Sequence, residues 1–154
     1  MLQWIDIIKY AKYSNPEPDR RVVRTEAEWQ QILTPAQYQV MRQKGTEPPY
    51  RNLYCRSYEP GRYVCAGCGS ALFNSTEKYH AISGWPSFTQ PAGKAAVKYA
   101  FDESYGMSRM EAVCNVCDSH LGHVFSDGPE PAGLRYCINS QSLHRVDEEQ
   151  SVHG

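Results

Sequence analysis

Two pairs of cysteines, each separated by two residues, give the chain its clearest chemical signal. The pairs are Cys65-Ala66-Gly67-Cys68 and Cys114-Asn115-Val116-Cys117. A tight turn can present both thiolates of a pair to one ion, so two such turns supply the four ligands of tetrahedral Zn²⁺. Gly69 fits the left-handed conformation that such a turn favours. We therefore expect a structural zinc site, because four protein ligands leave no open position for a reacting water.

Other uses of these cysteines are compatible with the same spacing. The pairs could form disulfides, remain as buried thiols, or exchange disulfides as redox C-x-x-C pairs do. His120, three residues after Cys117, could also replace one thiolate at the metal. Soft thiolates suit zinc well, so the sequence favours the four paired cysteines as the ligands.

Two further cysteines, Cys55 and Cys137, remain for other chemistry. Cys137 lies in the strand-like run Leu134-Arg135-Tyr136-Cys137-Ile138, where a cysteine is more often inert packing than a nucleophile. Arg135 strengthens the catalytic interpretation. Residues two apart on a strand point to the same face, and a guanidinium there would favour the reactive thiolate.

Polar and aromatic candidates lie upstream of Cys137. His120 and His123 flank Gly122, which predicts a close backbone approach or a turn; each histidine could equally be a bound core or surface residue. Asp127 could be only a turn residue before Gly128. In the loop Gly84-Trp85-Pro86-Ser87-Phe88, Phe88 is expected in the core. Trp85 could form the wall of a small apolar pocket.

The elements that must position these residues follow from local punctuation. Thr25-Glu26-Ala27-Glu28 and Thr34-Pro35-Ala36-Gln37 fit capping boxes, and predict short helices over about 26–32 and 35–43. Residues 1–23 look like an extension, with a short amphipathic helix in the first dozen residues and loose docking. Beyond residue 49, short runs of β-forming residues alternate with turn residues. They predict small antiparallel sheets, with strands around 62–64, 96–99, 110–113, 123–125 and 134–138.

Composition limits the class of protein. The 154 residues suit one domain, and a net charge of −1 with interspersed signs offers no footprint for nucleic acid or an anionic membrane. Apolar runs are far shorter than the ~20 residues of a spanning helix, and the start lacks the pattern of a secretory signal. Paired cysteines without a secretory signal suit the cytoplasm, where we place the chain.

Taken together, the motifs resemble the methionine-R-sulfoxide reductase family. The resemblance covers about residues 24–147 and rests on six segments in the family order: Gly45-Thr46-Glu47, Cys65-x-x-Cys68, Gly84-Trp85-Pro86-Ser87-Phe88, Cys114-x-x-Cys117, His120-Leu121-Gly122-His123-Val124-Phe125 and Arg135-Tyr136-Cys137-Ile138-Asn139-Ser140. It implies a mainly β fold, in which two three-stranded antiparallel sheets form a β-tent beside short N-terminal helices. It predicts an extension over 1–23, the catalytic domain over 24–147 and a tail over 148–154.

The resemblance also implies roles for particular residues. Cys137 would attack the sulfoxide and the four paired cysteines would hold zinc. The remaining active-site polar residues would be His120, His123, Asp127, Arg135 and Asn139. Trp85 would bind the substrate methyl group, with Phe125 close by. The implied function is repair of oxidised protein methionine through a cysteine sulfenic acid, with a thioredoxin-like protein as reductant.

The chain departs from the family at one position. Many members carry a resolving cysteine directly before Gly-Trp-Pro-Ser-Phe, where this chain has Ser83. A serine cannot form a disulfide, so Cys55 is our candidate for the resolving residue. The alternative is that a reductant acts directly on Cys137. Resolution would require the two Cα atoms to approach within ~7 Å, by movement of a loop.

Three other functions use part of the same sequence. A zinc-ribbon module for nucleic acid or a protein partner needs only the cysteine pairs, and would carry a basic stripe. A zinc-dependent hydrolase or deaminase would need an open metal position and an H-x-E arrangement, which the sequence lacks. A thiol-disulfide oxidoreductase would keep one C-x-x-C pair free of metal.

Overall fold

Two of the three helices begin at the predicted capping boxes. The computed structural model describes residues 1–147, with helices at Trp4–Lys12 (α1), Glu26–Ile32 (α2) and Pro35–Arg42 (α3). The Thr25 hydroxyl accepts the Glu28 amide at 3.2 Å, and the Thr34 hydroxyl accepts the Gln37 amide at 3.1 Å. These bonds satisfy amides that the first turn leaves free, so the predicted helix starts are confirmed.

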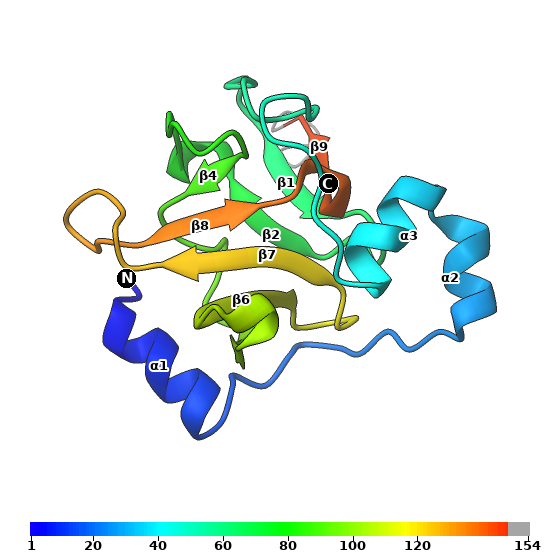
Figure 1. Cartoon of the computed structure of the whole chain (residues 1–154), viewed down its shortest axis with the longest axis horizontal. Coiled ribbons are helices and arrows are strands. Elements are labelled where there is room, and N and C mark those ends of the chain that lie inside the picture. The colour runs from blue at the N-terminus through cyan, green and yellow to red at the C-terminus, as the bar shows by residue number, and fades with distance from the viewer. Residues whose placement is uncertain (148–154) are drawn as a thin grey trace.

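The remaining elements form two antiparallel sheets (Figure 1). The smaller sheet has the order β2-β1-β9, from Ala71–Asn74, Arg62–Cys65 and Leu143–Val146. The larger has the order β3-β4-β8-β7-β6-β5, from Lys78–Tyr79, Ser87–Phe88, Arg135–Ile138, His120–Phe125, Arg109–Cys114 and Val97–Asp102. Short 3₁₀ turns occur at Ser75–Glu77, Ser104–Gly106 and Ser140–Ser142. The mainly β fold with two antiparallel sheets and short helices is confirmed.

One detail of that prediction is wrong, because the larger sheet has six strands where three were expected. Strand β3, at one edge of this sheet, and its neighbour β4 have two residues each. A two-residue strand shows no alternation of apolar and polar side chains, so sequence periodicity cannot reveal it. The pairing of β4 with β8 is a long-range contact that only the tertiary fold supplies.

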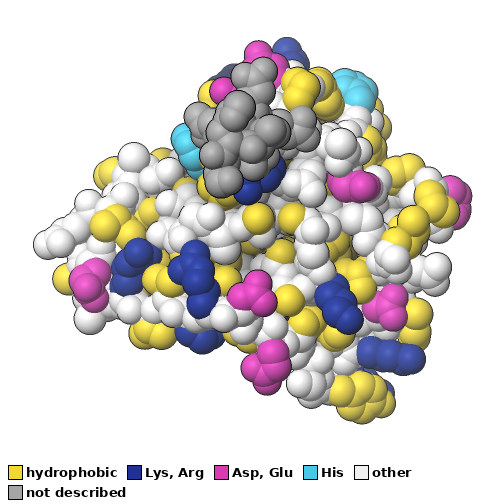
Figure 2. Space-filling view, turned by 180° about the vertical axis from the view of Figure 1, so that it is seen from behind, with side chains coloured by type: hydrophobic (Ala, Val, Ile, Leu, Met, Phe, Trp, Pro, Cys, Tyr) yellow, Lys and Arg dark blue, Asp and Glu magenta, His cyan; other side chains and the backbone are white. Residues whose placement is uncertain are grey.

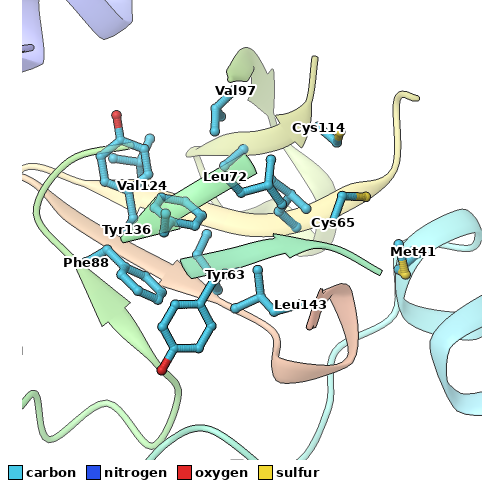
Figure 3. Packing of buried hydrophobic residues seen from close by; sticks show 14 of the residues in the cluster. Met41, Tyr63, Cys65, Leu72, Phe88, Val97, Cys114, Val124, Tyr136 and Leu143 are labelled. Carbon is cyan, nitrogen blue, oxygen red and sulfur yellow. The ribbon is translucent and has the colours of Figure 1, made fainter. Parts of the chain in front are cut away.

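The core lies where side chains of the two sheets meet, as Figure 3 shows. Phe73 of β2 stacks on Phe88 of β4 with ring centroids 4.4 Å apart. Tyr63 of β1 meets the same Phe88 edge-on at 5.2 Å. Such pairs add to the free energy gained from burying their area. Phe88 is fully buried, as expected, and it anchors β4, which pairs with the strand that carries Cys137.

Helix α1 is firmly docked, so the expectation of a loose N-terminal extension is wrong. Ile7 is 0% exposed, and Leu2 exchanges two backbone hydrogen bonds with the Gln90 side chain at 2.9 and 2.8 Å. After the helix, the Asn15 side chain pairs with both backbone groups of Tyr99 on β5. Burial of the apolar face of α1 offsets the conformational entropy that is lost when this segment becomes ordered. The predicted tail, 148–154, lies outside the described residues.

The surface agrees with an ordinary globular charge distribution. On the face seen in Figure 2, Lys and Arg side chains alternate with Asp and Glu. Within residues 1–147, no helix is long and apolar enough to cross a membrane. The separation of residues 1–23 from 24–147 as distinct units stays a prediction.

Candidate functional site

The four paired cysteines come together at one end of the two sheets. Their sulfur atoms all lie within 4.8 Å of one another. The Sγ atoms of Cys65 and Cys117 are 3.7 Å apart, and those of Cys68 and Cys114 are 3.6 Å apart. Tetrahedral Zn–S bonds of about 2.3 Å place sulfurs about 3.8 Å apart, so this set fits a structural metal ion. His120 is not a member of the cluster.

The backbone around the cluster has the conformation that the sequence predicted. Gly69 adopts a φ of 80°, and its amide donates to the Cys65 carbonyl at 2.8 Å. Asp118 takes the equivalent place in the second turn with a φ of 64°. An ion pair with Arg21 at 2.6 Å and a contact with Lys98 hold this strained residue.

Arginines from the N-terminal third of the chain cover the two cysteine turns. Arg24 donates to the Gly67 carbonyl at 2.8 Å, and Arg42 donates to the Cys117 carbonyl at 2.8 Å. The two guanidinium groups lie over the ring of Trp29, 4.8 and 4.5 Å from its centroid. The helices therefore brace the cluster, and positive charge lies close to four potential thiolates.

Cys137 lies at the centre of the larger sheet, on β8. It is paired with Ser87 of β4 on one side and with His123 of β7 on the other. Paired residues present their side chains to the same face of the sheet. The result is a pocket of about 100 Å³, lined by Thr46, Trp85, Arg109, Gly122, His123, Phe125, Cys137 and Asn139.

Gly122 permits this arrangement. A Cβ atom at this position would lie 2.1 Å from the carbonyl oxygen of Cys137, a distance that real atoms do not reach. The close backbone approach predicted between the two histidines is therefore confirmed. Any side chain here would push β7 away from β8 and separate His123 from Cys137.

Two influences act on the Cys137 thiol. Burial raises its pKa, while the Arg135 guanidinium and the Ser83 hydroxyl lower the pKa without overcoming burial. The Ser83 Oγ lies 4.0 Å from the sulfur. The thiol therefore carries its proton near pH 7, and Arg135 offsets only part of the penalty for ionisation.

Arg135 is itself held by Asp127. Its Nε and Nη2 donate to the two Asp127 carboxylate oxygens at 2.8 and 3.3 Å. This pairing lowers the pKa of Asp127. The guanidinium also lies 4.2 Å from the centre of the Phe125 ring. Asp127, Arg135 and Phe125 thus form one wall beside Cys137.

The two histidines occupy different environments. His123 lines the pocket, and its Nε2 lies 2.8 Å from Asp102. Burial lowers the pKa of His123, and the Asp102 carboxylate offsets this shift only in part. His120 is 4% exposed, bonded to Glu111 at 2.7 Å, and absent from the pocket lining. It contacts the ring of His123, with centroids 5.5 Å apart.

Glu47 organises the opposite wall. Its buried carboxylate accepts the amides of Ser140 and Gln141 at 2.6 and 2.8 Å. Burial raises the pKa of Glu47, although these two amides favour the charged form. Its carbonyl accepts the Trp85 indole N–H at 3.0 Å, and its amide donates to the Asn139 side chain at 3.1 Å.

Cys55 is not brought to Cys137. It does not line the pocket, and no sulfur-to-sulfur contact joins the two cysteines within residues 1–147. It follows Tyr54, whose amide donates to the Ser140 hydroxyl at 3.0 Å. That bond places the loop that carries Cys55 beside Ser140, which follows Cys137 in the same segment of the chain. Cys55 is half-buried and free.

Several residues of the site escaped the sequence analysis. Asp102, Arg109 and Glu111 lie on β5 and β6. The Asp102 and Glu111 carboxylates reach the histidines only across the sheet, once these strands have paired. Glu47 lies in the Gly45-Thr46-Glu47 segment, whose sequence gives no indication of its role. An acidic residue beside an expected strand carries no signal of its own, because most such residues are solvated.

Comparison with known proteins agrees with this geometry. The SelR domain family matches residues 33–147. A peptide methionine sulfoxide reductase MsrB of Cellvibrio japonicus is 54% identical, over 81% of this chain and 89% of the relative. The protein of the same name from Methanosarcina barkeri is 51% identical, over 88% and 95%, and that from Acinetobacter baylyi is 50% identical, over 83% and 92%. The chain belongs to the SelR-domain, or MsrB, family.

Proposed function

We propose that this protein reduces methionine-R-sulfoxide, chiefly in other proteins, to methionine. The observation that carries the proposal is the pocket in which Cys137 faces His123, Trp85 and Phe125, in a chain about half identical to peptide methionine sulfoxide reductases. A sulfoxide has an electrophilic sulfur and a basic oxygen. Its reduction needs a nucleophile and a proton at one place, and this pocket holds both.

In the first step the Cys137 sulfur attacks the sulfoxide sulfur, and the thiol proton moves to the sulfoxide oxygen. His123 relays this proton, since its lowered pKa leaves it neutral and able to accept near pH 7. The hydroxyl then moves from the methionine sulfur to Cys137. Methionine leaves as the thioether, reduced by two electrons, and Cys137 becomes a sulfenic acid, oxidised by two.

The other predicted residues position these groups. Arg135, paired with Asp127, stabilises negative charge on Cys137 as the sulfur–sulfur bond forms. His120, bonded to Glu111, packs against His123 and fixes its ring. Asn139 holds the Glu47 amide, and Trp85 and Phe125 enclose the substrate methyl group. Trp85 discriminates the R form, because a rigid indole accepts the methyl on one side only.

The sulfenic acid is then returned to the thiol. Cys55 condenses with it, which forms a disulfide and releases water, and a thioredoxin-like dithiol reduces the disulfide by exchange. Since the two cysteines are apart in the structure, the loop that carries Cys55 must move. Ser83 at the usual resolving position cannot form a disulfide. This supports Cys55 as the resolving residue, because it is the other cysteine outside the four-sulfur cluster.

We propose that the ion at the four cysteines is Zn²⁺ and that it is structural. Four thiolates at these distances suit zinc, and Cys65, Cys68, Cys114 and Cys117 would fill its coordination. When bound, it supplies cross-linking and no reaction step, because it has no position for substrate.

Turnover of the separated R and S forms of N-acetylmethionine sulfoxide, with dithiothreitol as reductant, tests the proposal. We expect turnover of the R form alone and its loss in Cys137→Ser, with Cys55→Ser as the matched control that stays active in dithiothreitol. Activity on neither form in the folded, metal-loaded protein would contradict the proposal and favour a binding module. Activity retained by Cys137→Ser would contradict the choice of nucleophile.

A further inference from the structure

A second and larger space is lined by Cys137 itself, and we call it the outer groove. It has a volume of about 630 Å³, against about 100 Å³ for the pocket. Its lining consists of residues 79–83 together with Trp85, Phe125, Asp127, Arg135 and Cys137. Trp85, Phe125 and Cys137 also line the pocket, so the two spaces share the candidate nucleophile and both aromatic rings.

The strand register places the walls of the outer groove on the face of the larger sheet that carries Cys137. Tyr79 of β3 and Cys137 of β8 pair with the same residue of β4. Cys137 also pairs with His123 of β7, and the next pair along these strands on the same face is Phe125 with Arg135. Because paired residues present their side chains to one face, the groove and the pocket lie on the same side of the sheet.

The charged and polar side chains of the outer groove already have partners. Arg135 and Asp127 pair with each other through two hydrogen bonds, at 2.8 and 3.3 Å. The Nδ1 atom of His80 lies 3.0 Å from the Tyr58 hydroxyl. Within residues 1–147, the lining therefore holds no unpaired charged side chain that could select a charge in a ligand.

Ile82 is the apolar group that the outer groove presents most openly to solvent, since it is 87% exposed. The half-buried rings of Trp85 and Phe125 line the same space, so Ile82 belongs to an apolar lining and is not an isolated surface side chain.

Hydrogen bonds hold the loop that carries Ile82. The Tyr50 hydroxyl donates to the Ile82 carbonyl. The Tyr50 amide and the Asn52 side chain donate to the Gly84 carbonyl at 2.7 and 2.9 Å. Ile82 is thus placed beside the groove before a ligand arrives, and a ligand that covers it removes its apolar surface from water.

We infer that the outer groove binds the polypeptide that flanks the oxidised methionine, and that Ile82 selects an apolar side chain next to that methionine. The inference rests on the proposed function. With the methyl group enclosed by Trp85 and Phe125, the neighbouring residues of the substrate need room that the small pocket lacks. The outer groove offers this room beside the same Cys137. An apolar neighbour would cover Ile82, whereas a serine would remove less apolar surface from water.

Blocked pentapeptides with methionine-R-sulfoxide at the centre test the inference, with leucine, serine or lysine on both sides of it. With dithiothreitol as reductant, we expect kcat/KM for the leucine peptide to exceed that for the serine peptide by about tenfold. Ile82→Ser should bring this ratio toward one. Ile82→Glu should lower kcat/KM for the leucine peptide and raise it for the lysine peptide by about threefold, because a carboxylate would then face the lysine.

Leu53 provides the matched controls. It is an aliphatic loop residue, 77% exposed, that lines a different space and not the outer groove. Leu53→Ser and Leu53→Glu should leave the order of the three peptides and their ratios as in the unmodified protein. Because Ile82 is exposed, its substitutions should leave the fold intact, which equal turnover of N-acetylmethionine-R-sulfoxide by the variants would verify.

The outcomes separate the two proposals. Equal kcat/KM for the leucine and serine peptides, in a protein that turns over N-acetylmethionine-R-sulfoxide, would overturn the inference and leave the proposed function in place. A leucine preference that Ile82→Ser does not reduce would also overturn it. So would an effect of Ile82→Ser confined to the KM for reduced thioredoxin, which would assign this face to the reductant. Turnover of none of the substrates would overturn the proposed function, and the inference with it.

Discussion

At the scale of single residues, the surroundings of Cys137 control whether its thiol keeps its proton. Burial keeps it on the sulfur, and Arg135 lowers the cost of its removal. The thiol is therefore a weak nucleophile in the free protein and becomes a strong one when the proton has a base to accept it. In the proposed reaction the sulfoxide oxygen is that base, which would couple the reactivity of Cys137 to the presence of substrate.

The first prediction concerns the pH dependence of Cys137. Because its pKa lies above the usual thiol value, the thiolate fraction should rise about tenfold per pH unit between about pH 6 and pH 8. The rate of alkylation by iodoacetamide, followed by mass spectrometry of the Cys137 peptide, should rise in the same proportion. Arg135→Gln removes a charge that lowers the pKa, so its rate at each pH should be lower. Arg51→Gln serves as the control, and a rate that levels off below about pH 7 would contradict the raised pKa.

Glu47 is the residue on which the pocket wall depends. Its carboxylate accepts two amides inside the protein, so Glu47→Gln turns one acceptor toward a donor and leaves a buried amide unsatisfied. We expect a loss of about 1–3 kcal/mol in the free energy of unfolding, measured by urea denaturation, and a raised KM because Trp85 is bonded to the Glu47 carbonyl. Glu59→Gln, at an exposed ion pair, should change the midpoint little. Coincident denaturation curves for Glu47→Gln and the unmodified protein would disprove this role.

At the scale of elements, the cysteine cluster joins the two sheets. One cysteine turn connects β1 to β2, and the other connects β6 to β7. An ion at this point cross-links sheets that otherwise meet only through the core. Arg24 and Arg42 donate to carbonyls of these same turns. The N-terminal segment is therefore attached to the junction of the two sheets.

Metal removal should therefore destabilise the whole protein. We expect one zinc ion per chain by elemental analysis, and a loss on the order of several kcal/mol when it is extracted with a mercurial and a chelator. Cys114→Ser should lose the metal and show a lower Tm. Cys55→Ser should retain the metal and the Tm of the unmodified protein. An extracted protein with an unchanged Tm would argue against a structural ion.

At the scale of the whole molecule, the turnover that we propose with a protein reductant requires Cys55 and Cys137 to meet. We expect Cys55→Ser to lose most thioredoxin-dependent turnover and to retain turnover with dithiothreitol, in steady-state assays of both. Ser83→Cys in that background should restore the thioredoxin-dependent rate, because the Ser83 Oγ already lies 4.0 Å from the Cys137 sulfur. Full thioredoxin-dependent activity in Cys55→Ser alone would show that the reductant acts directly on Cys137.

Much of the molecule was predictable because its signals are local. The helix starts follow from hydrogen bonds within one turn at Thr25 and Thr34. Gly122 indicated a close approach of two backbone segments, because only glycine fits beside the Cys137 carbonyl. Two C-x-x-C pairs predicted a four-sulfur cluster, since each pair needs only its own turn. The order of motifs around Cys137 is sufficient to indicate the family.

Other features depend on contacts between distant segments, which the sequence does not encode locally. The pairing of His123 with Asp102, the two amides on Glu47 and the two-residue strands β3 and β4 exist only once the larger sheet has formed. The docking of α1 likewise required its partners on β5. Tertiary structure also decided the charge state of Cys137: the sequence showed an arginine two residues away, but burial in the assembled sheet outweighs it, because desolvation depends on every neighbour at once.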